Sequence, residues 1–252
     1  MTNFSLEGKI ALITGASRGI GEAIALTFAE QGAHCILTSR KADALQGVVD
    51  KIESAGGKAL ACAANMGDLE QISSLFNFVK EKFGKLDILV NNAATNPYFG
   101  EMTGAEEWAW DKTMAVNLKG PFFATQEASR LMAVSGGGAI VNVASVNGVR
   151  PAPTQGIYSI TKAGLIAMTK AHAKELAGQN IRVNALLPGL TKTDFSKALF
   201  DIQEIHQHVI QQIPMQRHAE PHEMAGAVLY LVSDAASYTT GICITVDGGG
   251  LI

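Results

Sequence analysis

A tyrosine and a lysine four positions apart form a candidate reactive pair. Tyr158 and Lys162 bound the segment Tyr-Ser-Ile-Thr-Lys. On a helix this spacing places both side chains on one face, where the ammonium group lowers the pKa of the phenol from its reference of about 10. A phenol tuned in this way exchanges a proton with an alcohol or carbonyl oxygen near neutral pH. The pair alone is weak evidence, because ordinary helix surfaces contain such pairs by chance.

A serine upstream is a candidate partner for the same substrate oxygen. Ser145 follows the apolar run 139–143, which has the length of a buried strand. Doubly wound parallel sheets bind their ligands in the crevice at the carboxyl ends of the strands. We therefore expect the Ser145 hydroxyl to face that crevice and to hold the oxygen to which Tyr158 gives a proton.

A glycine-rich turn follows the first apolar run, 10–13. At a turn from strand to helix, glycine permits a positive φ and close approach to a pyrophosphate, while the helix N-terminus offers unpaired N–H groups. The Lys-Ser/Thr pair of a P-loop is missing, which disfavours an NTPase. A purely structural turn is the alternative. The turn reads Thr14-Gly15-Ala16-Ser17-Arg18-Gly19-Ile20-Gly21.

The residues after the second apolar run indicate the cofactor. About 20 residues past the glycine turn, a dinucleotide fold usually places Asp or Glu on the ribose 2′-hydroxyl. This chain has Thr38, Ser39 and Arg40 there, and no carboxylate. An arginine pairs instead with a 2′-phosphate through charge-assisted hydrogen bonds. The sequence therefore predicts NADP, held by Arg40 and, as a second cation, by Arg18.

The elements that must position these residues alternate regularly along the chain. Short apolar runs are continuous in sequence, which indicates strands buried on both faces. Segments with helical periodicity separate them, as parallel strands require. We interpret residues 1–252 as a single domain in the α/β class, a doubly wound parallel sheet flanked by helices. The apolar runs are 10–13, 35–37, 59–62, 86–90, 139–143, 181–187 and 242–246.

Composition and charge exclude several classes of function. The chain is 47% hydrophobic and 17% charged, which excludes intrinsic disorder. Its net charge of −3 gives no electrostatic footprint for nucleic acid or an anionic membrane. Its three scattered cysteines predict core residues rather than a metal site. We expect a cytoplasmic protein, because the first residues lack an apolar signal and the last three, Gly250-Leu251-Ile252, are not a peroxisomal address.

Several motifs together resemble those of the short-chain dehydrogenase/reductase family, in its order and spacing over essentially the whole chain. The resemblance implies a Rossmann-type fold, hydride transfer with NADP, no metal at the reacting centre and a homotetramer. The spacing of Tyr158 and Lys162 argues against the related enoyl reductases, in which these residues are six apart. The motifs are Thr14-Gly15-x3-Gly19-x-Gly21, Asn91-Asn92-Ala93, Asn117, Ser145, Tyr158-x3-Lys162 and Pro188-Gly189.

The resemblance also implies a role for each matching residue. Tyr158 is the general acid/base, Lys162 lowers its pKa and binds the nicotinamide ribose, and Ser145 holds the substrate oxygen. The neighbourhood of Asn117 positions a water that relays protons, or its amide stabilises an irregular helix turn. Asn65 stands where many members have Asp beside the adenine. The implied cofactor residues outside the glycine turn are Ser39, Arg40, Asn65, Met66, Asn91, Ala93, Tyr158, Lys162, Pro188, Gly189, Leu190, Thr191 and Thr193.

An apolar stripe after the Pro188-Gly189 loop predicts a substrate lid around 190–215. Apolar side chains recur there with helical spacing, where the family has a mobile lid that excludes water. An ordinary core stripe is the competing interpretation. The residues of the stripe are Phe195, Leu199, Phe200, Ile202 and Ile205.

These features together predict an NADP-dependent oxidoreductase that interconverts an apolar ketone or aldehyde and its alcohol. The amino-acid sequences of the segments 91–100 and 188–196 most resemble those of NADP-dependent carbonyl and retinal reductases. One alternative is a 3-oxoacyl-(acyl-carrier-protein) reductase, which shares every catalytic motif. A more remote alternative is a dinucleotide-binding regulator without catalytic activity.

Overall fold

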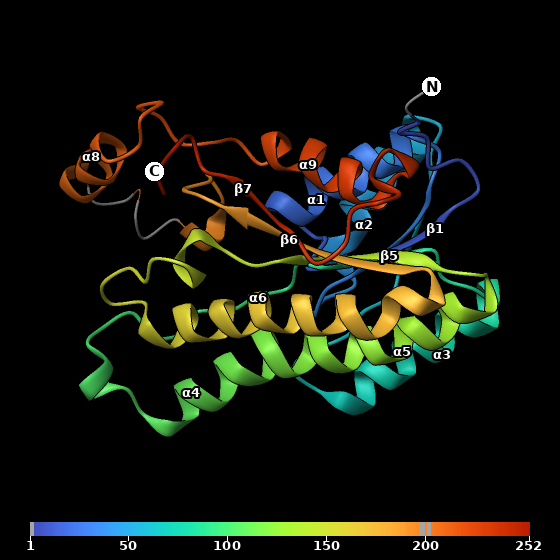
Figure 1. Cartoon of the computed structure of the whole chain (residues 1–252), viewed down its shortest axis with the longest axis horizontal. Coiled ribbons are helices and arrows are strands. Elements are labelled where there is room, and N and C mark those ends of the chain that lie inside the picture. Colours follow the sequence, from blue (N-terminus) through green and yellow to red (C-terminus); the bar gives the residue numbers. More distant parts are fainter. Residues whose placement is uncertain (1–2, 197–199, 201–202) are drawn as a thin grey trace.

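A parallel sheet of seven strands runs through the middle of the molecule (Figure 1). The computed structural model describes residues 3–196, 200 and 203–252. The strand order is β3-β2-β1-β4-β5-β6-β7, and each adjacent pair is parallel. The strands are β1 (Ile10–Thr14), β2 (His34–Thr38), β3 (Lys58–Ala61), β4 (Ile88–Asn91), β5 (Gly138–Val143), β6 (Ile181–Pro188) and β7 (Cys243–Val246).

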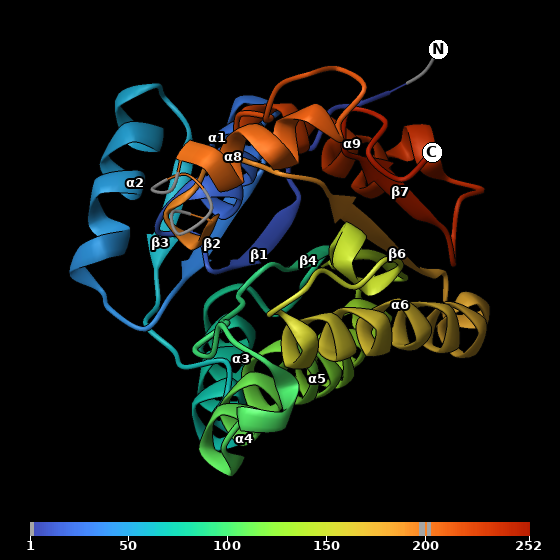
Figure 2. The ribbon, with the colours of Figure 1, turned by 90° about the vertical axis from the view of Figure 1, so that its left-hand side faces the viewer.

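Helices cover both faces of this sheet (Figure 2). One layer contains α1, α2 and α9, and the opposite layer contains α3, α5 and α6. The chain winds one way from β1 to β3 and the other way from β4 to β7, so that the order reverses between β1 and β4. The helices are α1 (Gly19–Glu30), α2 (Asp43–Ser54), α3 (Leu69–Phe83), α4 (Glu107–Met114), α5 (Gly120–Val134), α6 (Gly156–Leu176), α8 (Gln203–Gln211) and α9 (His222–Val232).

The continuous apolar runs form the strands because both faces of the sheet are covered. All five residues of β1 are buried, as are the last five of β5. Each helix layer supplies its own core, with Phe28 of α1 in one and Phe76 of α3 in the other. The predicted doubly wound sheet is therefore confirmed, while the strand bounds differ from the predicted runs by one or two residues at several ends. The division into domains stays a prediction.

A local irregularity joins α4 to α5. Residues Ala115–Lys119 form a π-helical turn between the two helices, and Val116 and Asn117 are buried within it. Such turns widen a helix locally and occur often at functional sites. The turn faces α6, with which it makes several backbone contacts. It thus carries Asn117 into the region where α6 begins.

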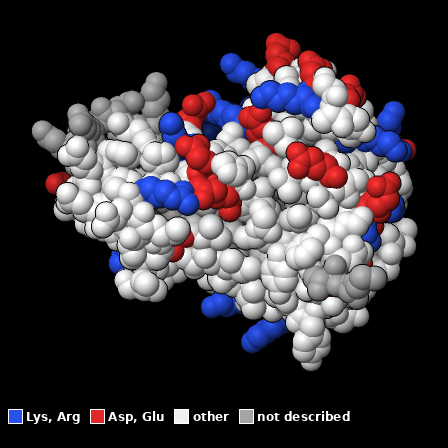
Figure 3. Space-filling model, turned by 90° about the horizontal axis from the view of Figure 1, so that it is seen from above, with Lys and Arg blue, Asp and Glu red and all other residues white. Residues whose placement is uncertain are grey.

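The distribution of charged side chains on the surface agrees with the small net charge of the chain. Positive and negative side chains are interspersed on the face shown in Figure 3. Among the residues that the structure describes, no helix is both long and apolar enough to cross a bilayer. All three cysteines are free, with Cys35 buried and Cys62 and Cys243 half-buried against the core.

Candidate active site

A cavity of about 1080 Å³ opens at the carboxyl ends of the central strands. It extends from the glycine turn after β1, past Ser39 after β2 and Ser145 after β5, to the loop after β6. The predicted site residues all line it, with the exceptions of Gly21, Asn91 and Asn117. The fold thus brings together motifs that are separated by up to about two thirds of the chain. This is the crevice position expected for a doubly wound sheet.

The glycine turn has the geometry of a cradle for a dinucleotide. Gly15 and Gly19 have φ values of +66° and +61°, which favour glycine. A Cβ on Gly15 would lie 2.9 Å from the Cα of Ala93, and a Cβ on Gly21 would lie 2.3 Å from the carbonyl oxygen of Gly15. Gly21 therefore packs against the backbone of the turn itself and does not line the cavity. The turn leads directly into α1, whose N-terminus suits a pyrophosphate.

A side-chain clamp fixes this turn to the end of β4. The Thr14 hydroxyl accepts hydrogen bonds from the backbone N–H groups of Asn92 (2.9 Å) and Ala93 (3.0 Å). The Asn92 amide donates to the carbonyl oxygens of Thr14 (2.8 Å) and Gly15 (3.1 Å). Both residues stand within the family motifs, but their sequence positions alone predict no contact between them. Their pairing joins segments 78 positions apart, which no local pattern reveals.

The proposed catalytic residues meet at the junction of β5 and α6. Tyr158 and Lys162 lie in the first two turns of α6, and the Lys162 Nζ lies 5.5 Å from the centroid of the Tyr158 ring. The same Nζ donates a 2.6 Å hydrogen bond to the carbonyl oxygen of Val143, near the end of β5. Ser145 lies just beyond that strand, where its hydroxyl contacts Tyr158. The predicted juxtaposition is therefore present.

The protonation of this group differs from the predicted tuning. Burial raises the pKa of Tyr158 to about 12, and the hydrogen bond from Ser145 only partly opposes this rise. Burial also lowers the pKa of Lys162 to about 7. The spacing alone predicted that an ammonium group would lower the phenol pKa. Desolvation outweighs that attraction here, because both side chains are almost completely removed from water.

Asn117 holds the loop after β4 against α6. Its amide donates to the carbonyl oxygen of Thr95 (2.8 Å) and to the Thr161 hydroxyl (3.2 Å), and it accepts from the Thr95 N–H (2.8 Å). The Asn117 side chain extends from the π-helical turn and contacts both the loop after β4 and helix α6. Its amide groups are thus bonded to protein atoms, as expected for a residue that supports an irregular turn, and the water relay stays a prediction.

The Asn91 side chain points to the face of the sheet that α5 and α6 cover, and it does not line the cavity. Its amide donates to Asn142 of β5 (2.9 Å) and to Thr125 of α5 (3.3 Å). Asn142 in turn donates to Thr169 of α6 (2.9 Å). These buried bonds link β4 and β5 to the two helices beneath them. Any contact of Asn91 with a cofactor would therefore come from its backbone.

The two predicted phosphate-binding arginines differ in their surroundings. Arg40 is exposed at the end of β2, beside Ser39, whose hydroxyl donates to the carbonyl oxygen of Lys41 (3.1 Å). Arg18 also lines the cavity, but its Nη1 lies 2.9 Å from the Oδ2 of Asp194. Both side chains of that pair are about two thirds exposed. Asp194 is 176 positions from Arg18 in the sequence, so no local pattern predicts it as a partner.

The segment after β6 covers one side of the cavity. Phe195, in a short 3-10 helix (Asp194–Ser196), places its ring 5.4 Å from that of Tyr158. Val209 of α8 and Ile213 beyond it also line the cavity, so the predicted lid region does face the site. Leu199 and Ile202 of the predicted stripe lie outside the described residues, as does the side chain of Ile205.

Comparisons with known proteins agree with this geometry. The family model described as enoyl-(acyl carrier protein) reductase matches residues 15–250. Dehydrogenase/reductase SDR family member 4 of Oryctolagus cuniculus is 39% identical over 97% of this chain and 94% of its own length. The 3-oxoacyl-(acyl-carrier-protein) reductase FabG of Thermotoga maritima is 41% identical over 98% and 99%. The chain belongs to the short-chain dehydrogenase/reductase family.

Solved structures extend the likeness to cofactor-bound enzymes. A gluconate 5-dehydrogenase from Burkholderia cenocepacia in complex with NADP and tartrate superposes with a TM-score of 0.95 at 30% identity, covering 99% of this chain and 97% of the other. A 7α-hydroxysteroid dehydrogenase with NADH and an oxo bile acid gives 0.94 at 36%, covering 99% and 96%. This chain is accordingly an oxidoreductase that acts on CH–OH groups with a nicotinamide dinucleotide.

Proposed function

We propose that the protein is an NADPH-dependent reductase of apolar ketones or aldehydes. The observation that carries this proposal is the continuity of one cavity, which contains Ser145, Tyr158 and Lys162 at one end and the exposed Arg40 at the other. The nicotinamide supplies the hydride when it is bound. The residues of the chain supply the proton, the orientation and the exclusion of water.

Tyr158 is the proton donor in this proposal. Its high pKa keeps the phenol protonated at neutral pH. A carbonyl oxygen that gains a hydride on its carbon becomes an alkoxide, a much stronger base than a phenolate, so that a proton on Tyr158 Oη transfers readily. Ser145 holds the same oxygen with its hydroxyl, and its hydrogen bond stabilises the charge that develops there. The protonated phenol is the form that the reduction of a carbonyl requires.

Lys162 supports Tyr158 from the same helix face. Burial lowers the pKa of its amine to about 7, so that the amine exchanges a proton readily near neutral pH and can return one to the site. The hydrogen bond to the carbonyl oxygen of Val143 fixes the direction of its Nζ at the end of β5. We therefore assign Lys162 to the nicotinamide ribose and to the restoration of the Tyr158 proton.

Apolar side chains make up a large part of the cavity wall. Phe99, Val146, Val209 and Leu251 are among them, alongside polar residues such as Asn147 and Gln212. Phe195 lies against the Tyr158 ring and shields the phenol from water. An apolar wall of this kind strengthens the electrostatic interactions within the site and gives little affinity to a highly polar substrate.

NADP is the proposed cofactor because Arg40 stands where a carboxylate would repel a 2′-phosphate. The arginine adds attraction, since a guanidinium binds phosphate through paired charge-assisted hydrogen bonds. The NADP-bound gluconate 5-dehydrogenase supports this choice, whereas the hydroxysteroid dehydrogenase with NADH is a relative that uses the other dinucleotide. The choice therefore depends on Arg40 itself.

A 3-oxoacyl-(acyl-carrier-protein) reductase is the second candidate. Lys112 and Arg150 both line the cavity and would favour an acidic carrier protein. The Arg150 guanidinium donates to the carbonyl oxygen of Gly250, which holds the C-terminal segment at the cavity rim. The similarity to the Thermotoga reductase points the same way.

One set of rate measurements tests both candidates. The purified enzyme is given NADPH with apolar ketones, quinones, retinoids, acetoacetyl-CoA and an acetoacetyl carrier protein. Faster turnover of the free ketones, quinones or retinoids supports the first candidate. A strong preference for the carrier-bound thioester, reduced in Lys112→Ala, supports the second. Failure to oxidise NADPH with any of these substrates contradicts both and favours a catalytically silent binding protein.

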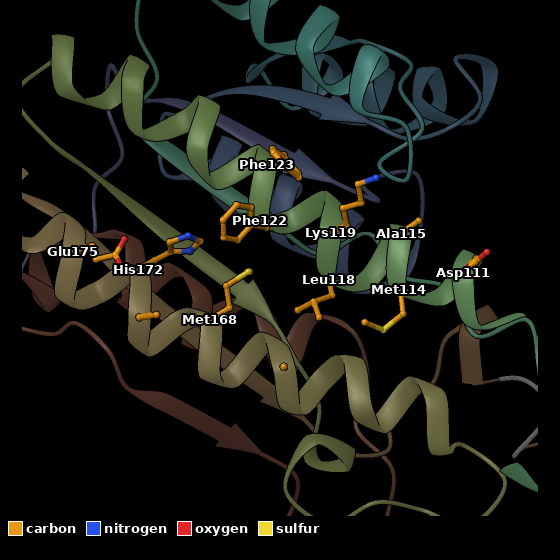
Figure 4. Close-up of a pocket in the computed structure, with 12 residues that line it drawn as sticks. Asp111, Met114, Ala115, Leu118, Lys119, Phe122, Phe123, Met168, His172 and Glu175 are labelled. Carbon is orange, nitrogen blue, oxygen red and sulfur yellow. The ribbon is translucent and has the colours of Figure 1, made fainter. Parts of the chain in front are cut away.

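We also propose a homotetramer in the cytoplasm. An apolar groove of about 860 Å³ lies between α5 and α6, where Leu118, Phe122 and Met168 point toward one another (Figure 4). Lys119 and Glu175 flank it. Charges of both signs around an apolar centre suit a second copy related by two-fold symmetry. Light scattering at micromolar concentration tests the assembly, and a stable monomer contradicts it.

A further inference from the structure

The loop after β6 lies directly on the glycine turn. A Cβ on Gly19 would lie 3.1 Å from the Thr193 Cγ2, so the Thr193 side chain packs closely against the Gly19 backbone. One residue to either side, Arg18 and Asp194 form an ion pair with an Nη1–Oδ2 distance of 2.9 Å. Arg18 is the N-cap residue of α1, and Asp194 begins the 3-10 helix. The ion pair therefore joins the two segments beside the contact of Thr193 with Gly19, at the cavity lining.

The loop that carries Asp194 is braced by its own hydrogen bonds. The Ser196 hydroxyl donates to the carbonyl oxygen of Thr191 (2.6 Å) and accepts from the Thr193 N–H (3.1 Å). The N–H of Lys192 donates to the carbonyl oxygen of Ala219 (2.9 Å), on the segment before α9. Asp194 thus faces Arg18 from a hydrogen-bonded turn.

The pair changes what a phosphate near Arg18 would experience. Within the described residues, Arg40 has no ion pair, whereas Arg18 has the Asp194 carboxylate beside it. A carboxylate at 2.9 Å offsets much of the guanidinium charge and competes for its N–H groups. Of the two predicted phosphate-binding arginines, Arg40 is therefore the one without a carboxylate partner in the part of the chain that the structure describes.

We propose that Asp194 is a specificity-determining residue for the cofactor, acting against the 2′-phosphate through Arg18. This inference rests on the proposed use of NADP. By holding Arg18 on the loop, Asp194 weakens the contribution of Arg18 to phosphate binding and leaves Arg40 to discriminate between the two dinucleotides. Removing the carboxylate charge strengthens NADPH binding more than NADH binding.

The exposure of the Arg18 and Asp194 side chains determines the expected size of the effect on cofactor affinity. Ion pairs between exposed side chains contribute about 0.2 to 1 kcal/mol, which corresponds to roughly 1.4- to fivefold in affinity. Asp194→Asn is therefore expected to raise the ratio of NADPH to NADH affinity by about 1.4- to fivefold at low salt. Because both cofactors carry the pyrophosphate, the ratio isolates the 2′-phosphate. The gain shrinks at high ionic strength, where exposed charges are screened.

Cofactor titrations followed by the fluorescence of the bound nicotinamide test this inference. They use wild type, Asp194→Asn, Asp194→Glu and Glu127→Gln. Asp194→Glu keeps the charge, and Glu127→Gln breaks an exposed ion pair with Arg130 far from the cavity. Both controls are expected to keep the wild-type ratio. An unchanged ratio in Asp194→Asn overturns the proposal, and so does an equal gain in Glu127→Gln.

A double-mutant cycle tests whether the effect passes through Arg18. In an Arg18→Ala background, Asp194→Asn is expected to change the affinity ratio by less than about 1.4-fold. The same gain with and without Arg18 contradicts the mechanism. The cofactor assignment has a separate readout: a wild type without any preference for NADPH refutes NADP use itself. A preference that depends on Arg40 but ignores Asp194 refutes only this inference.

Discussion

The two ends of the cavity carry their charged and polar groups in opposite environments. At the cofactor end, Arg18 and Arg40 are exposed, and solvent and salt surround them. At the catalytic end, Tyr158 is only 7% exposed and Lys162 only 2%. At the cofactor end, exposed cations attract the negative charge of a ligand through solvent, and salt screening limits the strength of each interaction. At the catalytic end, desolvation is the main influence on the protonation states of the buried side chains.

This contrast explains why the same kind of residue has different consequences in the two places. An exposed cation changes binding by an amount that salt reduces. A buried amine changes its own pKa, because the folded protein disfavours its charged form. Substitutions at the catalytic end should therefore alter chemistry and stability, and substitutions at the cofactor end should alter selectivity.

The largest expected effect is at the buried end. Tyr158→Phe removes the proton donor and keeps the ring against Phe195, so the fold and cofactor affinity should persist. Turnover should fall by about 10²- to 10⁴-fold, the usual contribution of general acid/base catalysis. Steady-state kinetics with NADPH measure the loss. Tyr230→Phe, which removes a hydroxyl that contacts Thr239, is the matched control. A kcat near that of wild type in Tyr158→Phe would remove the residue from the mechanism.

The second largest effect is expected on cofactor binding at the exposed end of the cavity. Wild type should bind NADPH at least tenfold more tightly than NADH, since hydrogen bonds to charged groups contribute about 1.5 to 3 kcal/mol. Arg40→Ala should erode most of this preference and leave NADH affinity nearly unchanged. Lys41→Ala, which removes the neighbouring exposed cation, is the control. Fluorescence titration at two salt concentrations decides the matter, because only the NADPH affinity of wild type should fall steeply with salt. Equal affinities in wild type, or a preference that survives in Arg40→Ala, would show that Arg40 does not bind the phosphate.

The sequence predicted most of the fold because its signals are local. Continuous apolar runs identify buried parallel strands, and the glycine spacing identifies the turn after β1. The same runs could not show which strands adjoin, so the clamp between Thr14 and Asn92 and the pair between Arg18 and Asp194 were missed. The latter two residues are 176 positions apart, and only the finished sheet brings them together.

The protonation states of Tyr158 and Lys162 at the catalytic end could also not be predicted from the sequence. The spacing of Tyr158 and Lys162 predicts their proximity correctly, because helical geometry is local. Their pKa values depend on burial by residues from several elements, and helical spacing contains no information on that. The orientation of Asn91 was missed for a related reason, since a strand residue faces one side of the sheet or the other according to register.

The smallest expected effect concerns stability, and it tests the buried end independently of activity. Burial lowers the pKa of Lys162 from 10.5 to about 7 in the folded protein. Between these values the unfolded chain binds a proton that the folded protein does not. Stability contributed by this group therefore rises with pH, with a slope that approaches about 1.4 kcal/mol per pH unit.

Tyr158 and Cys35 act in the opposite sense at higher pH. Burial raises the pKa of each to about 12, so the unfolded chain loses those protons first and stability falls above pH 9. The useful window is therefore pH 7.5 to 8.5. Urea unfolding of wild type and Lys162→Met in that window isolates the lysine, because the other groups contribute equally to both proteins. Wild type should gain about 1 kcal/mol relative to Lys162→Met across one pH unit. Parallel pH dependences would mean that the Lys162 amine stays charged in the folded protein, which would make the two ends of the cavity electrostatically alike.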